Sequence, residues 1–70
     1  MKLEIKTTKG TTRNYNLSQT ATGVDCYRIG GGFFSSSQTF IGHGHDVAAG
    51  VLICRIDAGD HLVRSIHLHN

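Results

Sequence analysis

The sequence predicts a single small all-β domain over residues 1–70, an antiparallel meander of five or six strands closed into a barrel or sandwich. Three observations predict this class. Short segments alternate apolar and polar side chains, which is the period of a half-buried strand. Turn-forming residues separate these segments, and the chain contains nine glycines and no proline. A chain this short buries only about 60% of its unfolded surface and forms one domain.

The first predicted element is a hairpin over residues 1–18. Its first strand alternates apolar and charged side chains, so Leu3 and Ile5 share one face. A Lys-Gly turn follows, in which the glycine can adopt a positive φ. The returning strand places Arg13, Tyr15 and Leu17 on one side and Thr12 and two asparagines on the other.

A second strand pair is predicted over residues 24–29 and 33–41, after a polar connector at residues 19–23. Three consecutive glycines at residues 30–32 interrupt the pair. Because they have no side chains to pack, we expect them to form a turn, a bulge or a loop that faces a ligand. Residues 42–46, Gly-His-Gly-His-Asp, are expected to be irregular.

The last 24 residues predict a third hairpin, with strands at residues 51–56 and 62–68. Asp-Ala-Gly-Asp at residues 57–60 is typical of the turn between them.

The alternative is an α+β fold with a short helix near residues 46–56. Asp46 would cap this helix, and Gly59 would lie just after its end. Gly50 in its middle and several β-branched residues have low helix propensity. The strand interpretation is therefore preferred.

The predicted third hairpin is apolar on both faces. Leu52, Cys54 and Ile56 would share one face of its first strand, while Val51 and Ile53 would share the other. A small sheet covers one face with its own core. We therefore expect a second copy of the chain to cover the other face, which makes the protein a homo-oligomer. A central strand buried on both sides within one chain is the alternative.

Composition indicates the compartment and excludes some partners. Seven basic and five acidic residues give a net charge of +2 without a basic stripe, so a nucleic-acid partner is not expected. No apolar run approaches the roughly 20 residues that span a membrane. Without an export signal, Cys26 and Cys54 are expected to be free buried thiols in a cytoplasmic protein. A disulfide or a reactive thiol is the alternative.

The segment that most resembles a ligand site is Arg28 together with the glycines and the residues after them. Successive glycine amides can form a nest of donors for an anion, and serine hydroxyls add further donors. A guanidinium can bind phosphate, and a phenylalanine ring can stack on a base. The alternative is a purely structural role, in which the glycines form a turn and a phenylalanine packs in the core. The candidate ligand-binding residues are Arg28, Gly30, Gly31, Gly32, Phe33, Phe34, Ser35 and Ser36.

His43 and His45 form one His-x-His pair, and His67 and His69 form a second; on a strand this spacing places two imidazoles on one face. His43 and His45 are the pair considered further. They are the candidate metal ligands, and Asp46 could add an oxygen. The alternative is that they are solvated polar side chains.

We expect no enzymatic activity and no cofactor, because no motif assembles a nucleophile with a base. The sequence best fits a homo-oligomeric binding module. It would sequester a small anionic, phosphorylated or nucleotide-like ligand, or inhibit a protein partner by blocking its surface. Proteins of this size and composition are common in phages and mobile elements. The alternative is a metal-binding protein that uses the His-x-His pairs.

Overall fold

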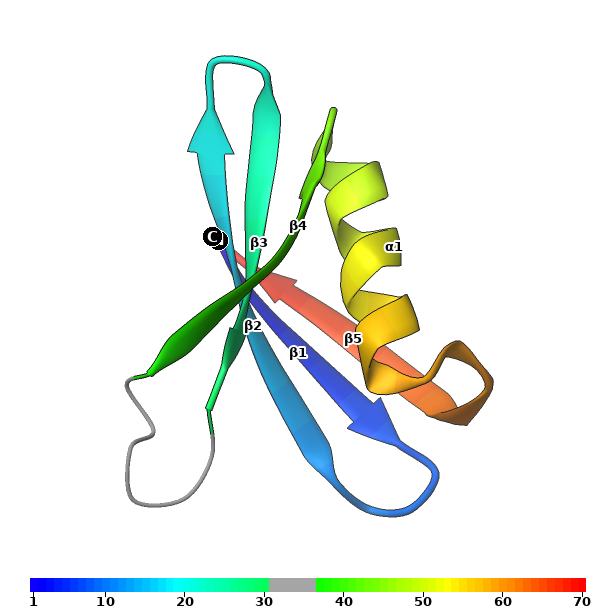
Figure 1. Cartoon of the computed structure of the whole chain (residues 1–70). Helices are drawn as coiled ribbons and strands as arrows, with labels where there is room; N and C mark the ends of the chain where they lie inside the picture. Colours follow the sequence, from blue (N-terminus) through cyan, green and yellow to red (C-terminus); the bar gives the residue numbers. More distant parts are fainter. Residues whose placement is uncertain (31–36) are drawn as a thin grey trace.

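The computed structural model describes residues 1–30 and 37–70. Five strands form one antiparallel sheet in the order β4-β3-β2-β1-β5, and a helix crosses one of its faces (Figure 1). The elements are β1 (Lys2–Thr7), β2 (Thr12–Thr20), β3 (Gly23–Ile29), β4 (Gln38–Gly44), α1 (Val47–Ala58), the 3-10 helix η2 (Asp60–Leu62) and β5 (Val63–His69).

The fold is the α+β alternative, and the helix takes the place of the strand predicted at residues 51–56. The carboxylate of Asp46 accepts a hydrogen bond of 2.8 Å from the Ala49 amide, which caps the first turn of α1. Gly59 ends the helix with a φ of +93°, and its N–H donates to the carbonyl of Ile56. The predicted third hairpin is therefore wrong.

The sheet is open, so the predicted closure into a barrel or sandwich is also wrong. Within the described residues, β4 and β5 are its two edges, because β5 pairs with β1 rather than with residues 51–56. The helix now covers one face of the sheet, and closure is not needed to build a core. In the part of the chain that the structure describes, no helix is long and apolar enough to cross a bilayer.

The predicted first hairpin is confirmed. β1 pairs with β2 in the register Leu3↔Tyr15, and Gly10 in the turn has a φ of +82°. β3 also lies where a strand was predicted, whereas residues 42–44 continue β4 instead of being irregular.

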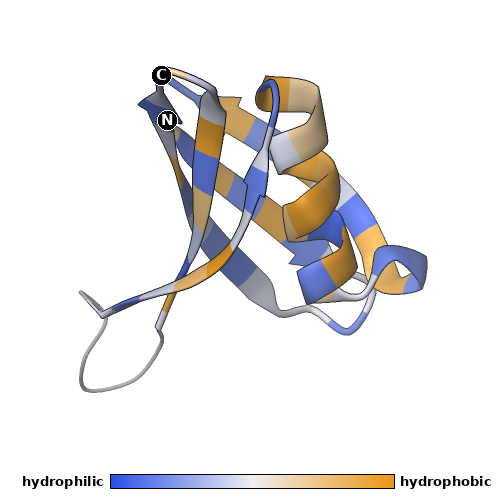
Figure 2. Cartoon of the chain, turned by 45° about the horizontal axis from the view of Figure 1, so that its top comes forward, coloured by the Kyte–Doolittle hydropathy of each residue, from blue (hydrophilic) through white to orange (hydrophobic). Residues whose placement is uncertain are grey.

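The core lies between α1 and the sheet face that α1 covers (Figure 2). Alternation along β1, β2 and β3 directs every second side chain toward the helix, which is the pattern that the sequence predicts for the first hairpin. The buried apolar side chains are Leu3, Ile5, Tyr15, Leu17, Val24, Cys26, Cys54 and Ala58.

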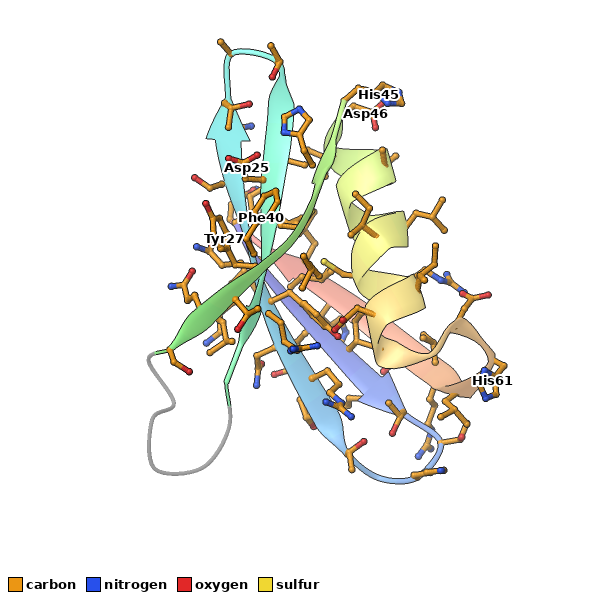
Figure 3. The ribbon with its side chains drawn as sticks, in the orientation of Figure 1. Asp25, Tyr27, Phe40, His45, Asp46 and His61 are labelled. Atoms are coloured by element: carbon orange, nitrogen blue, oxygen red, sulfur yellow. The ribbon has the colours of Figure 1, made fainter. Side chains whose placement is uncertain are left out.

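The opposite face of the sheet, here called the open face, carries polar side chains and one aromatic pair. The rings of Tyr27 and Phe40 meet edge to face with centroids 5.7 Å apart (Figure 3). Lys2 and Lys6 of β1 also lie on this face, since Leu3 and Ile5 point to the core.

Candidate anion-binding site

β2 and β3 diverge at one end of the sheet (Figure 1). Residues of both strands line a pocket at this end. The ladder between these strands ends at the pair Tyr15↔Arg28, although β2 stays paired with β1 as far as Thr12. The space between the diverging strands, here called the β2–β3 pocket, has a volume of about 290 Å³. Its lining residues are Thr11, Thr12, Arg13, Asn14, Arg28, Ile29 and Gly30.

Backbone amides face this pocket. The Thr7 amide donates to the Thr11 carbonyl at 3.0 Å, so the odd-numbered residues of β2 bond to β1. Because backbone groups alternate sides along a strand, the amides of Thr12 and Asn14 point toward β3. Both residues lie before the β2–β3 ladder begins, so these amides are directed into the pocket.

Two arginines line the pocket from different strands, and a carboxylate of the helix positions one of them. The Arg28 Nη1 donates to Asp57 Oδ1 at 2.9 Å, and the Tyr15 hydroxyl donates to Asp57 Oδ2 at 2.8 Å. A guanidinium has five donors, so this contact leaves Arg28 with donors for a second anion. Arg13 adds another exposed guanidinium.

Tyr15 is fully buried beneath this cluster. Burial, together with its hydrogen bond to Asp57, raises the pKa of the Tyr15 hydroxyl above its ordinary value. Tyr15 therefore remains a neutral hydrogen-bond donor at neutral pH. Its role is to hold Asp57, and through Asp57 the Arg28 side chain, in place.

Two residues of the ligand site predicted from the sequence, Arg28 and Gly30, line the β2–β3 pocket. Gly30 directly follows β3, and its amide donates to the Ser37 carbonyl at 2.8 Å. The other predicted site residues, Gly31, Gly32, Phe33, Phe34, Ser35 and Ser36, lie outside the described residues.

Sequence reasoning missed the β2 side of the pocket, residues 11–14. Arg13 stands out as a charge on the apolar-side parity of its strand, which is the signal that could have found it. The sequence does not indicate that the neighbouring threonine hydroxyls and backbone amides belong to a site, because they face a pocket only where β3 separates from β2.

His43 is hydrogen-bonded to other side chains of the same chain. Its Nδ1 lies 2.7 Å from Asp25 Oδ1, and its Nε2 lies 3.2 Å from Thr22 Oγ1. The hydrogen bond to Asp25 raises the pKa of His43 above its ordinary 6.5. His45 is exposed at the start of α1, with Nε2 3.5 Å from a carboxylate oxygen of Asp46 (Figure 3).

Among the described residues, no group of three or more His, Cys, Asp or Glu side chains is placed to hold a metal ion. The predicted metal site at His43 and His45 stays a prediction.

Cys26 and Cys54 are free and buried, which confirms the prediction of core thiols. The Cys26 thiol donates to the carbonyl of Gly50 at 3.5 Å. Burial raises the pKa of the Cys54 thiol to about 12 and also raises the pKa of Cys26. Because the thiolate is the reactive form, both side chains are poor nucleophiles at neutral pH.

Comparison with protein-family models, with curated proteins and with solved structures finds no match for this chain. The chemistry of its pockets is therefore the basis for assigning a function.

Proposed function

We propose that this protein is a binding module that sequesters a small phosphorylated ligand in the β2–β3 pocket. The observation that carries the proposal is the pair of arginines, Arg13 and Arg28, that line this pocket from two strands. No carboxylate belongs to the described residues that line it. The net charge of +2 is small, so recognition of an anion has to be local.

The donors of the pocket favour phosphate over a monovalent carboxylate. Phosphate has several terminal oxygens, each of which can accept more than one hydrogen bond. The pocket is lined by two arginines and two threonines, and the amides of Thr12 and Asn14 add donors. Ligand pockets generally measure about 300–1,000 Å³, so a pocket at the lower limit of this range fits a small ligand.

The lining groups support binding rather than catalysis. Arginine remains protonated and cannot accept a proton at neutral pH. Threonine hydroxyls need an adjacent base to become nucleophiles. The groups that line the pocket are thus suited to binding an anion, not to transferring a proton or attacking a substrate.

Isothermal titration calorimetry with inorganic phosphate and with a nucleoside monophosphate tests this proposal. Arg13→Gln removes one charged donor, and a hydrogen bond to a charged group contributes about 1.5–3 kcal/mol, so we expect affinity to fall by about tenfold or more. Arg13 is preferred to Arg28 for this test because Arg28 also pairs with Asp57, so its loss would disturb the helix contact.

Lys2→Gln is the matched control, because it removes one positive charge from the same sheet far from the pocket. We expect its affinity to stay within about twofold of the unaltered protein, since a distant exposed charge is screened by salt. The proposal is wrong if neither probe binds, or if Arg13→Gln and Lys2→Gln bind with the same affinity.

A further inference from the structure

The outer edge of β5 carries backbone groups that pair with no described strand. The Thr7 amide donates to the Thr11 carbonyl, so the odd-numbered residues of β1 bond to β2. Because backbone groups alternate sides along a strand, the even-numbered residues of β1 bond to β5. Their partners in the register are the odd-numbered residues of β5, Ser65, His67 and His69. The N–H and C=O groups of Ile66 and Leu68 therefore point away from β1, toward the free edge.

One face of this edge is apolar. Ile66 and Leu68 lie directly opposite Ile5 and Leu3, so their side chains are on the helix-covered side of the sheet. The helix α1 packs mainly on β4 and β3, at the other side of the sheet, and Leu68 is 44% exposed. The edge thus presents an apolar row that continues the core and is incompletely covered.

The other face of this edge is basic. His67 and His69 lie on the open face, because they alternate with Ile66 and Leu68. Arg64, the residue at which the register of β5 shifts, lines the same pocket as Lys6 of β1. β5 contains no carboxylate, and β1 contains one. A strand added at this edge would meet apolar side chains on one face and basic side chains on the other.

The opposite edge of the sheet, β4, is less suited to adding a strand. The register between β4 and β3 shifts between Cys26 and Tyr27, and β4 contains two glycines that offer a neighbour no side chain to contact. In contrast, residues 65–69 of β5 keep one register with β1.

We propose that the free edge of β5 binds an extended segment of a partner protein in which apolar and acidic residues alternate. The segment pairs antiparallel with β5, as strands do throughout this sheet, and its backbone bonds to Ile66 and Leu68. Its apolar side chains extend the row of Ile66 and Leu68, and its carboxylates lie on the open face near Arg64 and His67. A second copy of β5 would set basic side chains against basic ones, so charge complementarity favours an acidic strand. This surface shares no residue with the β2–β3 pocket.

Fluorescence anisotropy with a labelled peptide of alternating glutamate and valine, as long as the seven residues of β5, tests this proposal. In antiparallel pairing, a residue directly opposite Ile66 or Leu68 exchanges backbone hydrogen bonds with it and shares its face, so the valines supply these bonds. N-methylation of the valines should lower the affinity by about tenfold or more, and N-methylation of the glutamates should change it by less than about twofold. A peptide with lysine in place of glutamate should bind at least about tenfold more weakly at low salt.

Leu68→Pro locates the bound peptide on the protein. Because the Leu68 amide points away from β1, proline removes an outward donor without removing a hydrogen bond of the sheet. The affinity for the acidic peptide should fall by about tenfold or more. Leu68→Val keeps the amide and is the matched control, with an expected change of less than about threefold. Thermal unfolding of both variants verifies the fold, and the N-methylated peptides test the unaltered protein if proline prevents folding.

The outcomes distinguish this proposal from the proposed phosphate site. Leu68→Pro should bind inorganic phosphate as the unaltered protein does, so the failure of one proposal leaves the other standing. The strand-addition proposal is wrong if the acidic peptide does not bind, if the two N-methylated peptides bind equally, or if Leu68→Pro binds as tightly as Leu68→Val. If Leu68→Pro lowers the sedimentation coefficient of the protein without peptide, the edge binds a second copy and the proposed partner is wrong.

Discussion

Asp57 connects the helix to two strands through its two carboxylate oxygens. One oxygen accepts from the buried Tyr15 hydroxyl of β2, and the other accepts from Arg28 of β3. A carboxylate that is four-fifths buried needs such partners, because a buried charge without them is costly. The same contacts fix the direction of the Arg28 guanidinium. Packing of the core and placement of a candidate ligand group thus depend on one side chain.

The contact between His43 and Asp25 predicts a pH dependence of stability. Because the pKa of His43 is raised in the folded state, its protonated form is favoured there. The resulting stabilisation is fully present below the unfolded pKa of about 6.5 and disappears as pH rises through the higher folded pKa. Asp25→Asn should therefore lower stability at acidic pH and have little effect in mildly alkaline solution.

Proton NMR titration of the His43 ring measures this effect directly. The midpoint should lie above the 6.5 of a free imidazole and fall when Asp25 becomes Asn. An unchanged His43 midpoint in the variant would show that the contact does not form in solution.

At the scale of elements, α1 shows how packing can reverse a propensity argument. Gly50 lowers helix propensity, and this is one reason why the sequence favours a strand at residues 51–56. In the structure Gly50 is buried against β3, where a Cβ would lie 2.5 Å from Val24 Cγ2 and 3.3 Å from Cys26 Sγ. The glycine allows the helix to approach the sheet closely.

Gly50→Ala should therefore destabilise the protein although alanine is the better helix former. Overpacking costs about 1–3 kcal/mol, and the gain in helix propensity offsets about 1 kcal/mol, so we expect a net loss of up to about 2 kcal/mol. Urea denaturation followed by circular dichroism measures the change.

Ala48→Gly, at an exposed position one turn earlier than Leu52 in the same helix, isolates the propensity effect. It should cost about 0.5–1 kcal/mol. A Gly50→Ala variant more stable than the unaltered protein would mean that α1 does not pack on β3 as closely as described.

At the scale of the whole molecule, the prediction of a homo-oligomer stays a prediction, and its physical basis has changed. The apolar residues expected on two faces of a hairpin lie instead around a helix. This helix, α1, covers the face of the sheet that a second subunit was expected to cover. Apolar surface nevertheless remains on the outside of the helix. Leu52 is 53% exposed and Ile56 is 65% exposed, one turn apart on the same side.

We predict that this outer face is the contact between two copies, packed as an antiparallel pair of helices. A two-fold axis at Leu52 would place Ala48 of one copy opposite Ile56 of the other, which sets a small side chain against a large one. Changing Leu52 and Ile56 together to Lys should convert the oligomer to a monomer in sedimentation velocity at micromolar concentration.

Phe40→Lys is the control, because Phe40 is also exposed (56%) but lies on the open face. It should leave the sedimentation coefficient unchanged. If the unaltered protein is a monomer at this concentration, the prediction of self-association is wrong. If Phe40→Lys dissociates the oligomer as much as the double variant does, the prediction that the contact lies on the outer face of α1 is wrong.

Patterns between neighbouring residues were sufficient to predict the first hairpin and the ends of the helix. The alternation around Leu3 and Tyr15 predicted the first hairpin and its buried face, because strand period and turn chemistry are properties of neighbouring residues. The capping signals at Asp46 and Gly59 were also visible, and they correctly marked the ends of the alternative helix.

Tertiary structure decided the rest. Residues 51–56 are apolar at nearly every position, so they have no period that separates a strand from a helix. The close packing of Gly50 against β3 favours the helix. The pairing of β5 with β1 joins opposite ends of the chain. Arg13 and Arg28 are 15 positions apart in sequence, and they meet at one pocket only because β3 leaves β2 beyond their last pair. The sequence thus predicted the β3 side of the candidate site but not the β2 side, because a pocket between strands depends on where their pairing stops.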